Sequence, residues 1–230
     1  MPEIYLVRHA QASFGTENYD TLTPDGVQQS KWLGDYFLKR GLTFNHAISG
    51  DMQRHIQTLE LIGEKLDLKS EQHEVLPGFN EYDFKELIHV FGAQNPEDDL
   101  YQAAMNQSDD KKAFYRLLRR VLMAWSDDQL DGAAESWQMF KQRVNAASST
   151  IQQLAGSGQR ALIISSGGAI SMFVGLVLDL AAEKIIDLNM QAKHTGISRF
   201  FFNEQRISLN EFNATPHLEH SQRVKLITQG

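Results

Sequence analysis

Two basic side chains stand side by side where the first apolar segment of the chain ends. Residues 4–7 form a short apolar run, and Arg8 and His9 follow it directly. Such a run predicts a fully buried β-strand, and open α/β sheets bind their ligands at the carboxyl ends of their strands. This position makes the pair a candidate for a functional site, although a histidine at a strand end can also serve only to cap or pack.

A third basic residue, Arg54, falls in the first turn of a helix that we predict over residues 52–66. The helix follows a second short strand near residues 46–48, and Asp51 is placed to cap it. An arginine in a first helical turn opposes the helix dipole, so its position suits an anion better than it suits the helix. An ordinary surface arginine is the alternative interpretation.

A serine- and glycine-rich turn joins a third expected strand, residues 161–165, to a helix that begins near residue 168. The turn contains Ser166 and Gly167. Backbone N–H groups at a helix start bind anions, and glycines allow a ligand to approach the backbone closely. The pattern predicts an anion cradle here, although many strand-to-helix turns contain glycine without binding a ligand.

Two carboxyl groups, Glu81 and Asp83, flank Tyr82 in a segment that we predict to be a loop, residues 75–83. A carboxyl group near bound phosphate can have a raised pKa and act as a general acid, whereas most loop carboxylates are simply solvated. Phosphoryl transfer needs cationic donors, a nucleophile held in line and an acid for the leaving oxygen. The four patterns together supply these groups.

The composition favours a folded protein and excludes several kinds of site. Apolar residues make up 42% of the 230 residues, the formal net charge is −7, and there is no cysteine. Disulfides, thiolate catalysis and cysteine metal sites are therefore excluded, and the lack of a basic block argues against nucleic acid as a partner. No membrane span is expected, because a polar turn at residues 165–168 divides the apolar stretch 161–178. No signal peptide is expected either, because the first residues lack a basic segment followed by a long apolar one. We expect a cytoplasmic protein.

Strand and helix patterns alternate through most of the chain. We expect strands at residues 4–7, 46–48, 161–165, 196–202 and 206–209, and helices at residues 24–40, 52–66, 133–154 and 168–180. This alternation predicts an α/β fold of three layers, with a mostly parallel sheet and helices on both of its faces. Residues 85–131 are helical and partly acidic, and we interpret them as a helical cap insertion in a single domain over residues 1–230.

Four ordered motifs resemble those of the histidine phosphatase (phosphoglycerate mutase-like) superfamily. The Arg8-His9 pair closes the first strand, as it does in that family. Residues 22–29 match a Leu-Thr-x-x-Gly-x-x-Gln element, with the last glutamine retained or shifted by one position. Residues 51–58 match the last eight positions of a Ser-x-x-x-Arg-x-x-Gln-Thr helix start, and residues 79–83 match an acidic loop. The resemblance covers the core of the chain but not the helical insertion.

The resemblance implies a phosphatase mechanism without a metal or a cofactor. His9 would attack the phosphorus atom and become phosphohistidine, which water then hydrolyses. Glu81, or alternatively Asp83, would protonate the leaving alkoxide. We expect substrate binding by Arg8, Arg54, Ser166 and Gly167. The expected partner is a small phosphorylated substrate or inorganic phosphate.

The chain departs from the family pattern where a second histidine is usual. That position is Ser166, whose hydroxyl can donate one hydrogen bond to phosphate but carries no charge. His194, just before a late strand, is the first candidate to fill the gap, although a structural role is commoner for such a residue. His55 follows Arg54 on its helix and is expected to point roughly 100° away from it.

These departures leave more than one function open. The first is a metal-free phosphatase for a small phosphomonoester, and the second is a catalytically weak or inactive protein that binds a phosphorylated ligand, which Ser166 favours. A domain without a ligand is the third. A mutase is disfavoured, because it must keep its phosphoryl group between substrates while excluding water. Ala10-Gln11 replaces the usual glycine and acidic residue after His9, so substrate specificity is not carried over, and the oligomeric state is not determined by these patterns.

Overall fold

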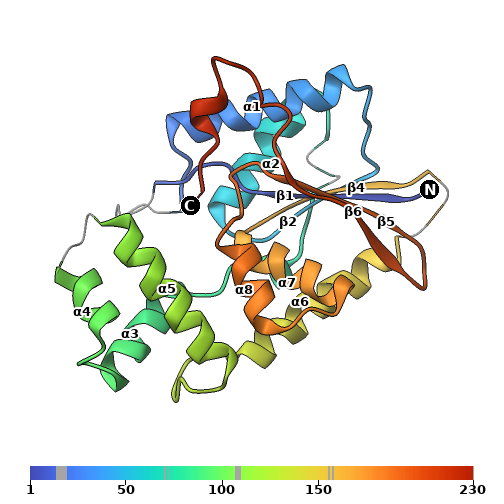
Figure 1. The fold of residues 1–230 in the computed structure, drawn as a ribbon. Helices are drawn as coiled ribbons and strands as arrows, with labels where there is room; N and C mark the ends of the chain where they lie inside the picture. The colour runs from blue at the N-terminus through green and yellow to red at the C-terminus, as the bar shows by residue number, and fades with distance from the viewer. Residues whose placement is uncertain are drawn as a thin grey trace.

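A six-stranded sheet runs through the chain, of which the computed structural model describes residues 1–13, 20–69, 71, 73–106, 110–154, 156 and 158–229 (Figure 1). The strands are β1 (Glu3–Arg8), β2 (His46–Ser49), β3 (His73–Val75), β4 (Arg160–Ser165), β5 (Ile197–Phe202) and β6 (Ile207–Ala214). Their order is β3-β2-β4-β1-β5-β6. The first four run parallel, while β5 and β6 add an antiparallel edge. The predicted α/β class with a mostly parallel sheet is confirmed.

Helices cover both faces of this sheet (Figure 1). The helices are α1 (Pro24–Lys39), α2 (Gln53–Leu66), α3 (Phe84–Gln94), α4 (Asp99–Asn106), α5 (Lys111–Ser126), α6 (Trp137–Gln152), α7 (Gly167–Leu178) and α8 (Ala182–Asn189). On β1, Tyr5 and Val7 join the apolar cluster under α1 and α2, whereas Ile4 and Leu6 join the cluster on the opposite face. Alternate strand residues point to opposite faces, so an uninterrupted apolar run lets β1 bury both.

The start of α1 matches its prediction, whereas the start of α2 does not. Thr23 caps α1, and its side chain accepts a hydrogen bond from the N–H of Gly26 at 3.0 Å. The predicted capping of α2 by Asp51 is wrong. The carboxylate of Asp20 accepts from the N–H of Gln53 at 2.8 Å instead, while Asp51 is bonded to the side chain of Asn80. A residue distant in sequence therefore caps this helix.

Two short elements escaped prediction from the sequence. β3 has three residues, two of them exposed, and α8 has eight. Segments this short contain too few residues for an apolar period to be recognised. β6 also runs further than expected, to Ala214, because its pairing with β5 continues to Ile197.

The segment predicted as a helical insertion contains α3, α4 and α5. Trp125 on α5 packs this segment against the rest of the chain. The centre of a Trp125 ring lies between 5.1 and 5.5 Å from the ring centres of Tyr82, Trp137 and Phe140. Aromatic contacts of this kind combine a large buried area with a preferred geometry. They hold α5 beside the loop that contains Tyr82.

The apolar stretch at residues 161–178 divides into β4 and the twelve-residue helix α7, as predicted. The turn between them starts at Ser166. In the part of the chain that the structure describes, no helix is both long and apolar enough to cross a bilayer.

The motif at residues 22–29 holds the loop that follows β1. The side chain of Gln29 accepts a hydrogen bond from the N–H of Gln11 at 2.9 Å, so the last glutamine of the motif is retained at position 29. Gly26 lies so close to this loop that an added Cβ would be 2.1 Å from the carbonyl oxygen of Gln11. These residues position the loop beside His9 rather than contact a ligand themselves.

This close approach makes Gly26→Ala destabilising. We expect the free energy of unfolding to fall by about 1–3 kcal/mol, because the new methyl group must displace backbone atoms. Gly63→Ala in α2 is the matched control, since its nearest neighbour would lie at an ordinary 3.5 Å, and it should be neutral or stabilising by up to about 1 kcal/mol. Urea unfolding of both variants measures the difference, and equal stabilities would contradict the role given to Gly26.

Candidate active site

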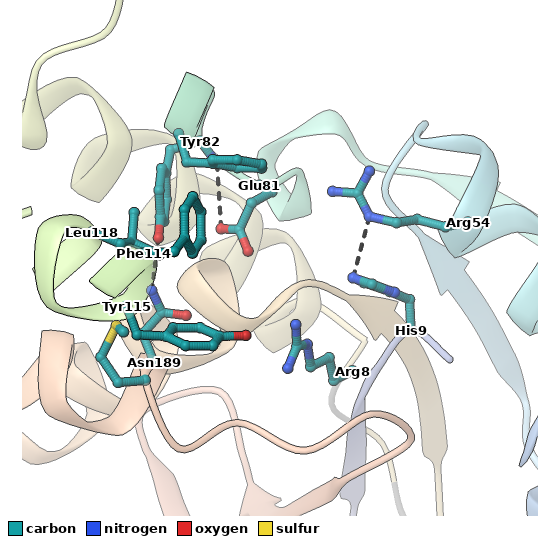
Figure 2. Close-up of a pocket in the computed structure, with 11 residues that line it drawn as sticks. Arg8, His9, Arg54, Glu81, Tyr82, Phe114, Tyr115, Leu118 and Asn189 are labelled. Carbon is teal, nitrogen blue, oxygen red and sulfur yellow. Dashed lines mark hydrogen bonds between the residues drawn. The ribbon is translucent and has the colours of Figure 1, made fainter. Parts of the chain in front are cut away.

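Four of the residues singled out in the sequence line one pocket: Arg8, His9, Arg54 and Glu81 (Figure 2). The parallel pairing of β1 with β4 places their carboxyl ends together, with Arg8 opposite Ser165. The remaining lining residues are Tyr82, Phe84, Phe114, Tyr115, Leu118, Asn189 and Met190. The pocket, including its open mouth, has an empty volume of about 510 Å³.

The hydrogen bonds of His9 define which ring nitrogen is available for chemistry. Its Nδ1 lies 2.8 Å from the carbonyl oxygen of Ala10, which can only accept, and its Nε2 lies 3.2 Å from Nε of Arg54, which can only donate. The network therefore assigns the hydrogen to Nδ1 and a lone pair to Nε2. Burial lowers the pKa of His9 well below its ordinary value, and the charges of Arg54 and Arg8 lower it further. His9 is a neutral base with its lone pair on the pocket side.

Arg54 is buried and uses all three of its guanidinium nitrogens. Nε faces His9, Nη1 forms an ion pair of 2.7 Å with Asp20, and Nη2 lies 3.4 Å from the hydroxyl oxygen of Ser166. Asp20 was missed by the sequence analysis, because it lies in a polar loop without a motif of its own. Arg8 donates from Nη1 to the carbonyl oxygen of Ala192 at 2.6 Å.

Glu81 reaches the pocket from the loop before α3. Its carboxylate accepts hydrogen bonds from the N–H of Gly168 at 3.1 Å and from the N–H of Tyr82 at 3.3 Å. Burial raises the pKa of Glu81, and the Gly168 bond and the charges of Arg54 and Arg8 only partly oppose that effect. A carboxyl group with a raised pKa is suited to donate a proton.

The loop that presents Glu81 is held from behind by Arg143 on α6. The guanidinium of Arg143 donates to the backbone oxygens of residues 78, 80 and 81 at 3.1, 2.7 and 3.3 Å. Asp83 points elsewhere: it is exposed and caps α3 by accepting from two backbone N–H groups at 3.0 Å. Of the two carboxyl groups proposed as the acid, Glu81 is the one in the pocket.

The turn after β4 offers fewer free backbone N–H groups to a ligand than the sequence suggested. The N–H of Gly168 is bonded to Glu81, and neither Ser166 nor Gly167 is among the residues that line the pocket. Gly167 packs beside Arg8: a Cβ atom added at Gly167 would lie 3.6 Å from Nε of that arginine. The N–H of Gly168 is therefore used within the protein, and binding of a ligand by Ser166 and Gly167 stays a prediction.

Two further histidines lie near His9. The ring centre of His194 is 5.7 Å away, and its Nδ1 contacts the hydroxyl of Thr228 at 2.8 Å. The expectation that His55 points away is wrong: its ring centre is 5.5 Å from that of His9, and its Nε2 lies 2.6 Å from Ser166 Oγ. Because α2 begins directly at the ends of the strands, two adjacent sides of its first turn face the site.

The sequence pattern of the histidine phosphatase superfamily (branch 1) matches residues 4–215. The chain belongs to this superfamily. Its sequence is 26% identical over 212 residues to a probable phosphoglycerate mutase of Salmonella choleraesuis, across 90% of this chain and 87% of that relative.

Solved structures of this histidine phosphatase fold resemble the chain over nearly its whole length. A phosphoserine phosphatase variant from Entamoeba histolytica, bound to phosphoserine, gives a TM-score of 0.63 at 17% identity, covering 95% of this chain and 100% of that one. A putative α-ribazole-5′-phosphate phosphatase from Escherichia coli gives 0.65 at 18% identity, covering 93% and 96%. At these identities the likeness shows the shared fold.

Removing the charge of Asp20 should strengthen the binding of inorganic phosphate. Asp20→Asn keeps an oxygen to accept from the start of α2 but removes the anion that is paired with Arg54. We expect a roughly two- to fivefold tighter dissociation constant by titration calorimetry at low salt, since the Asp20 side chain is 45% exposed and such pairs are weak. Asp51→Asn is the matched control. A tightening of the same size in that variant would show a general charge effect rather than release of Arg54.

Proposed function

We propose that the protein is a phosphatase that hydrolyses a small phosphomonoester through a phosphohistidine at His9. The observation that carries this proposal is the neutral imidazole of His9, whose Nε2 lone pair faces Arg54 in the pocket that also contains Glu81. The superfamily membership supports it, as do the phosphatases with the same fold.

In the first step Nε2 of His9 attacks phosphorus and the ester P–O bond breaks. Arg54 exchanges its contact with Nε2 for the phosphoryl oxygens, and Arg8 binds them from the other side, so both offset the developing charge. Glu81, protonated because of its raised pKa, gives its proton to the leaving oxygen. The hydrogen bond from Nδ1 to the carbonyl of Ala10 stabilises the positive charge that the ring acquires.

In the second step a water molecule attacks the phosphohistidine. The carboxylate of Glu81 accepts a proton from this water as its oxygen bonds to phosphorus. The P–N bond breaks, and the electron pair returns to Nε2 of His9. Inorganic phosphate leaves, and Glu81 is again protonated for the next cycle.

The walls of the pocket favour an apolar leaving group. Among the described residues that line it, Arg8 and Arg54 are the cations, and both are used for the transferred phosphoryl group. Phe84, Phe114 and Tyr115 form much of the remaining wall. A second phosphate or a carboxylate on the substrate would meet aromatic rings there and lose hydration without gaining a cationic partner. This argues for a phosphatase with an aryl or similarly apolar substrate, and against a mutase acting on a bisphosphate.

The decisive test is turnover that depends on His9. We expect hydrolysis of para-nitrophenyl phosphate without added metal, and a loss of at least about 10³-fold in His9→Ala. Rapid acid-free quenching should trap phosphate on the protein in a form that is labile to acid and stable to base. His89→Ala, which removes an exposed histidine, is the control. If the native chain is inactive but binds phosphate, it is a phospho-ligand binding protein, the alternative that Ser166 favours.

Glu81→Gln should slow the reaction in a way that depends on the leaving group. Alkyl phosphates, whose alkoxides need a proton, should react about 10²–10⁴-fold more slowly, and aryl phosphates of acidic phenols much less so. In the native protein, kcat should pass through a maximum with pH. On the alkaline side kcat should fall as Glu81, whose pKa is raised, loses its proton, and on the acid side it should fall as His9, whose pKa is lowered, gains one.

The substitution should abolish the alkaline decline for alkyl phosphates, because glutamine does not ionise. Asp83→Asn is the control and should keep both the rate and the pH profile. An equal loss for alkyl and aryl substrates in Glu81→Gln would show that Glu81 is not the proton donor.

A further inference from the structure

A histidine and a serine that the mechanism above does not use are in contact behind Arg54. Nε2 of His55 lies 2.6 Å from Oγ of Ser166, and Nη2 of Arg54 lies 3.4 Å from the same oxygen. All three side chains are buried. The contact joins α2 to the turn after β4, across 111 positions of sequence.

The geometry of Arg54 places the Ser166 hydroxyl next to the reacting nitrogen. Nε and Nη2 form one edge of a planar guanidinium, and such an edge can bind two oxygens of a phosphoryl group at once. Here Nε meets Nε2 of His9 and Nη2 meets Oγ of Ser166. The two acceptors are therefore neighbours along that edge. A phosphoryl group that binds to His9 and takes this edge brings one of its oxygens beside Ser166.

The hydroxyl of Ser166 has one hydrogen and two lone pairs to distribute. Nη2 of Arg54 can only donate, so it takes one lone pair. If Nε2 of His55 carries a hydrogen, it takes the other lone pair, and the hydroxyl hydrogen is left for the phosphoryl oxygen. Ser166 stands at the N-cap of α7 but makes no side-chain capping bond. The helix therefore does not compete for this hydroxyl.

The surroundings of His55 favour the hydrogen on Nε2. Burial, and then the charge of Arg54, hold the pKa of His55 well below its ordinary value, so the ring is neutral and has one hydrogen. Its Nδ1 is buried with no hydrogen-bond partner among the described residues, and it faces Gly50, where an added Cβ would lie 2.5 Å away. Nδ1 lacks a partner in either tautomer, and a buried N–H without an acceptor is rarer in proteins than a buried acceptor without a donor.

We propose that His55 is a positioning residue: its Nε2–H holds the Ser166 hydroxyl so that the hydroxyl hydrogen binds the phosphoryl group on His9. The pair thereby supplies the hydrogen bond that the family's histidine would supply from position 166. This inference rests on the proposed phosphoryl transfer at His9. No covalent bond changes in the pair, and no proton leaves it.

Kinetics of single and double variants on para-nitrophenyl phosphate test the coupling. We expect Ser166→Ala to lower kcat by about 10²–10³-fold, the usual cost of one transition-state donor, with little change in KM. His55→Ala should lower kcat by at least about tenfold. The double variant should be no slower than Ser166→Ala, because His55 acts only through Ser166. An unchanged kcat in His55→Ala, or losses that multiply in the double variant, would overturn the proposal.

Two rescue variants separate positioning from a merely structural role. His55→Gln keeps a side-chain N–H donor and should retain more activity than His55→Ala. The double variant His55→Ala with Ser166→His moves the imidazole to position 166, into space that the alanine opens. It should exceed His55→Ala with Ser166→Ala by at least about tenfold. Failure of both rescues in proteins with native melting temperatures would contradict the assignment.

A second histidine–serine contact provides a matched control. Nε2 of His73 lies 2.7 Å from Oγ of Ser49, and neither residue lines the pocket. His73→Ala should therefore keep the native kcat. A loss in this variant equal to that of His55→Ala would show that losing any such pair slows the enzyme.

Binding of inorganic phosphate keeps the inference separable from the proposed function. If the native chain shows no turnover that depends on His9, the proposed function fails. Calorimetry with inorganic phosphate then tests whether His55 and Ser166 act together in binding. Equal weakening by His55→Ala and Ser166→Ala, with no further weakening in the double variant, would support the pair as a phosphate-binding unit. Native affinity in both single variants would overturn it.

Discussion

The hydrogen bond from Nε of Arg54 to Nε2 of His9 is the interaction on which the site depends. It assigns the imidazole tautomer, and it holds the guanidinium of Arg54 beside the ring nitrogen to which we assign the attack on phosphorus. The bond exists because β1 and β2 both pair with β4 in parallel, so that their carboxyl ends lie together. A change of one residue in the register between β1 and β4 would turn Arg8 to the other face of the sheet and separate these groups.

Burial shifts the pKa values of the proposed nucleophile, His9, and of the proposed acid, Glu81, in opposite directions. It lowers the pKa of His9, which keeps a lone pair for attack, and it raises the pKa of Glu81, which keeps a proton for the leaving group. In water near neutral pH a carboxyl group would be ionised, and a histidine would still be protonated in part. The low-polarity environment is therefore what makes nucleophile and acid available together.

Many of the polar side chains around the site hold backbone segments in position. Gln29 binds the N–H of Gln11, Thr58 binds the N–H of Ala10 at 3.1 Å, and Arg143 holds the loop that ends at Glu81. Buried or half-buried backbone groups need such partners, and each of these bonds fixes a segment next to a reacting side chain. The chemistry needs few residues, whereas holding them in place needs many.

The sequence by itself determined the alternation of strands and helices, the placement of Arg8 and His9 at a strand end and that of Arg54 in a first helical turn. Apolar period and end position are local properties, which is why the sequence was sufficient. Only the tertiary structure decided between Glu81 and Asp83, brought Asp20 to Arg54 and turned His55 toward Ser166. Each of these depends on which side chains meet across long stretches of chain. Sequence spacing determines on which side of its helix a residue such as His55 lies. Which residues that side contacts depends on how the helix packs against the sheet.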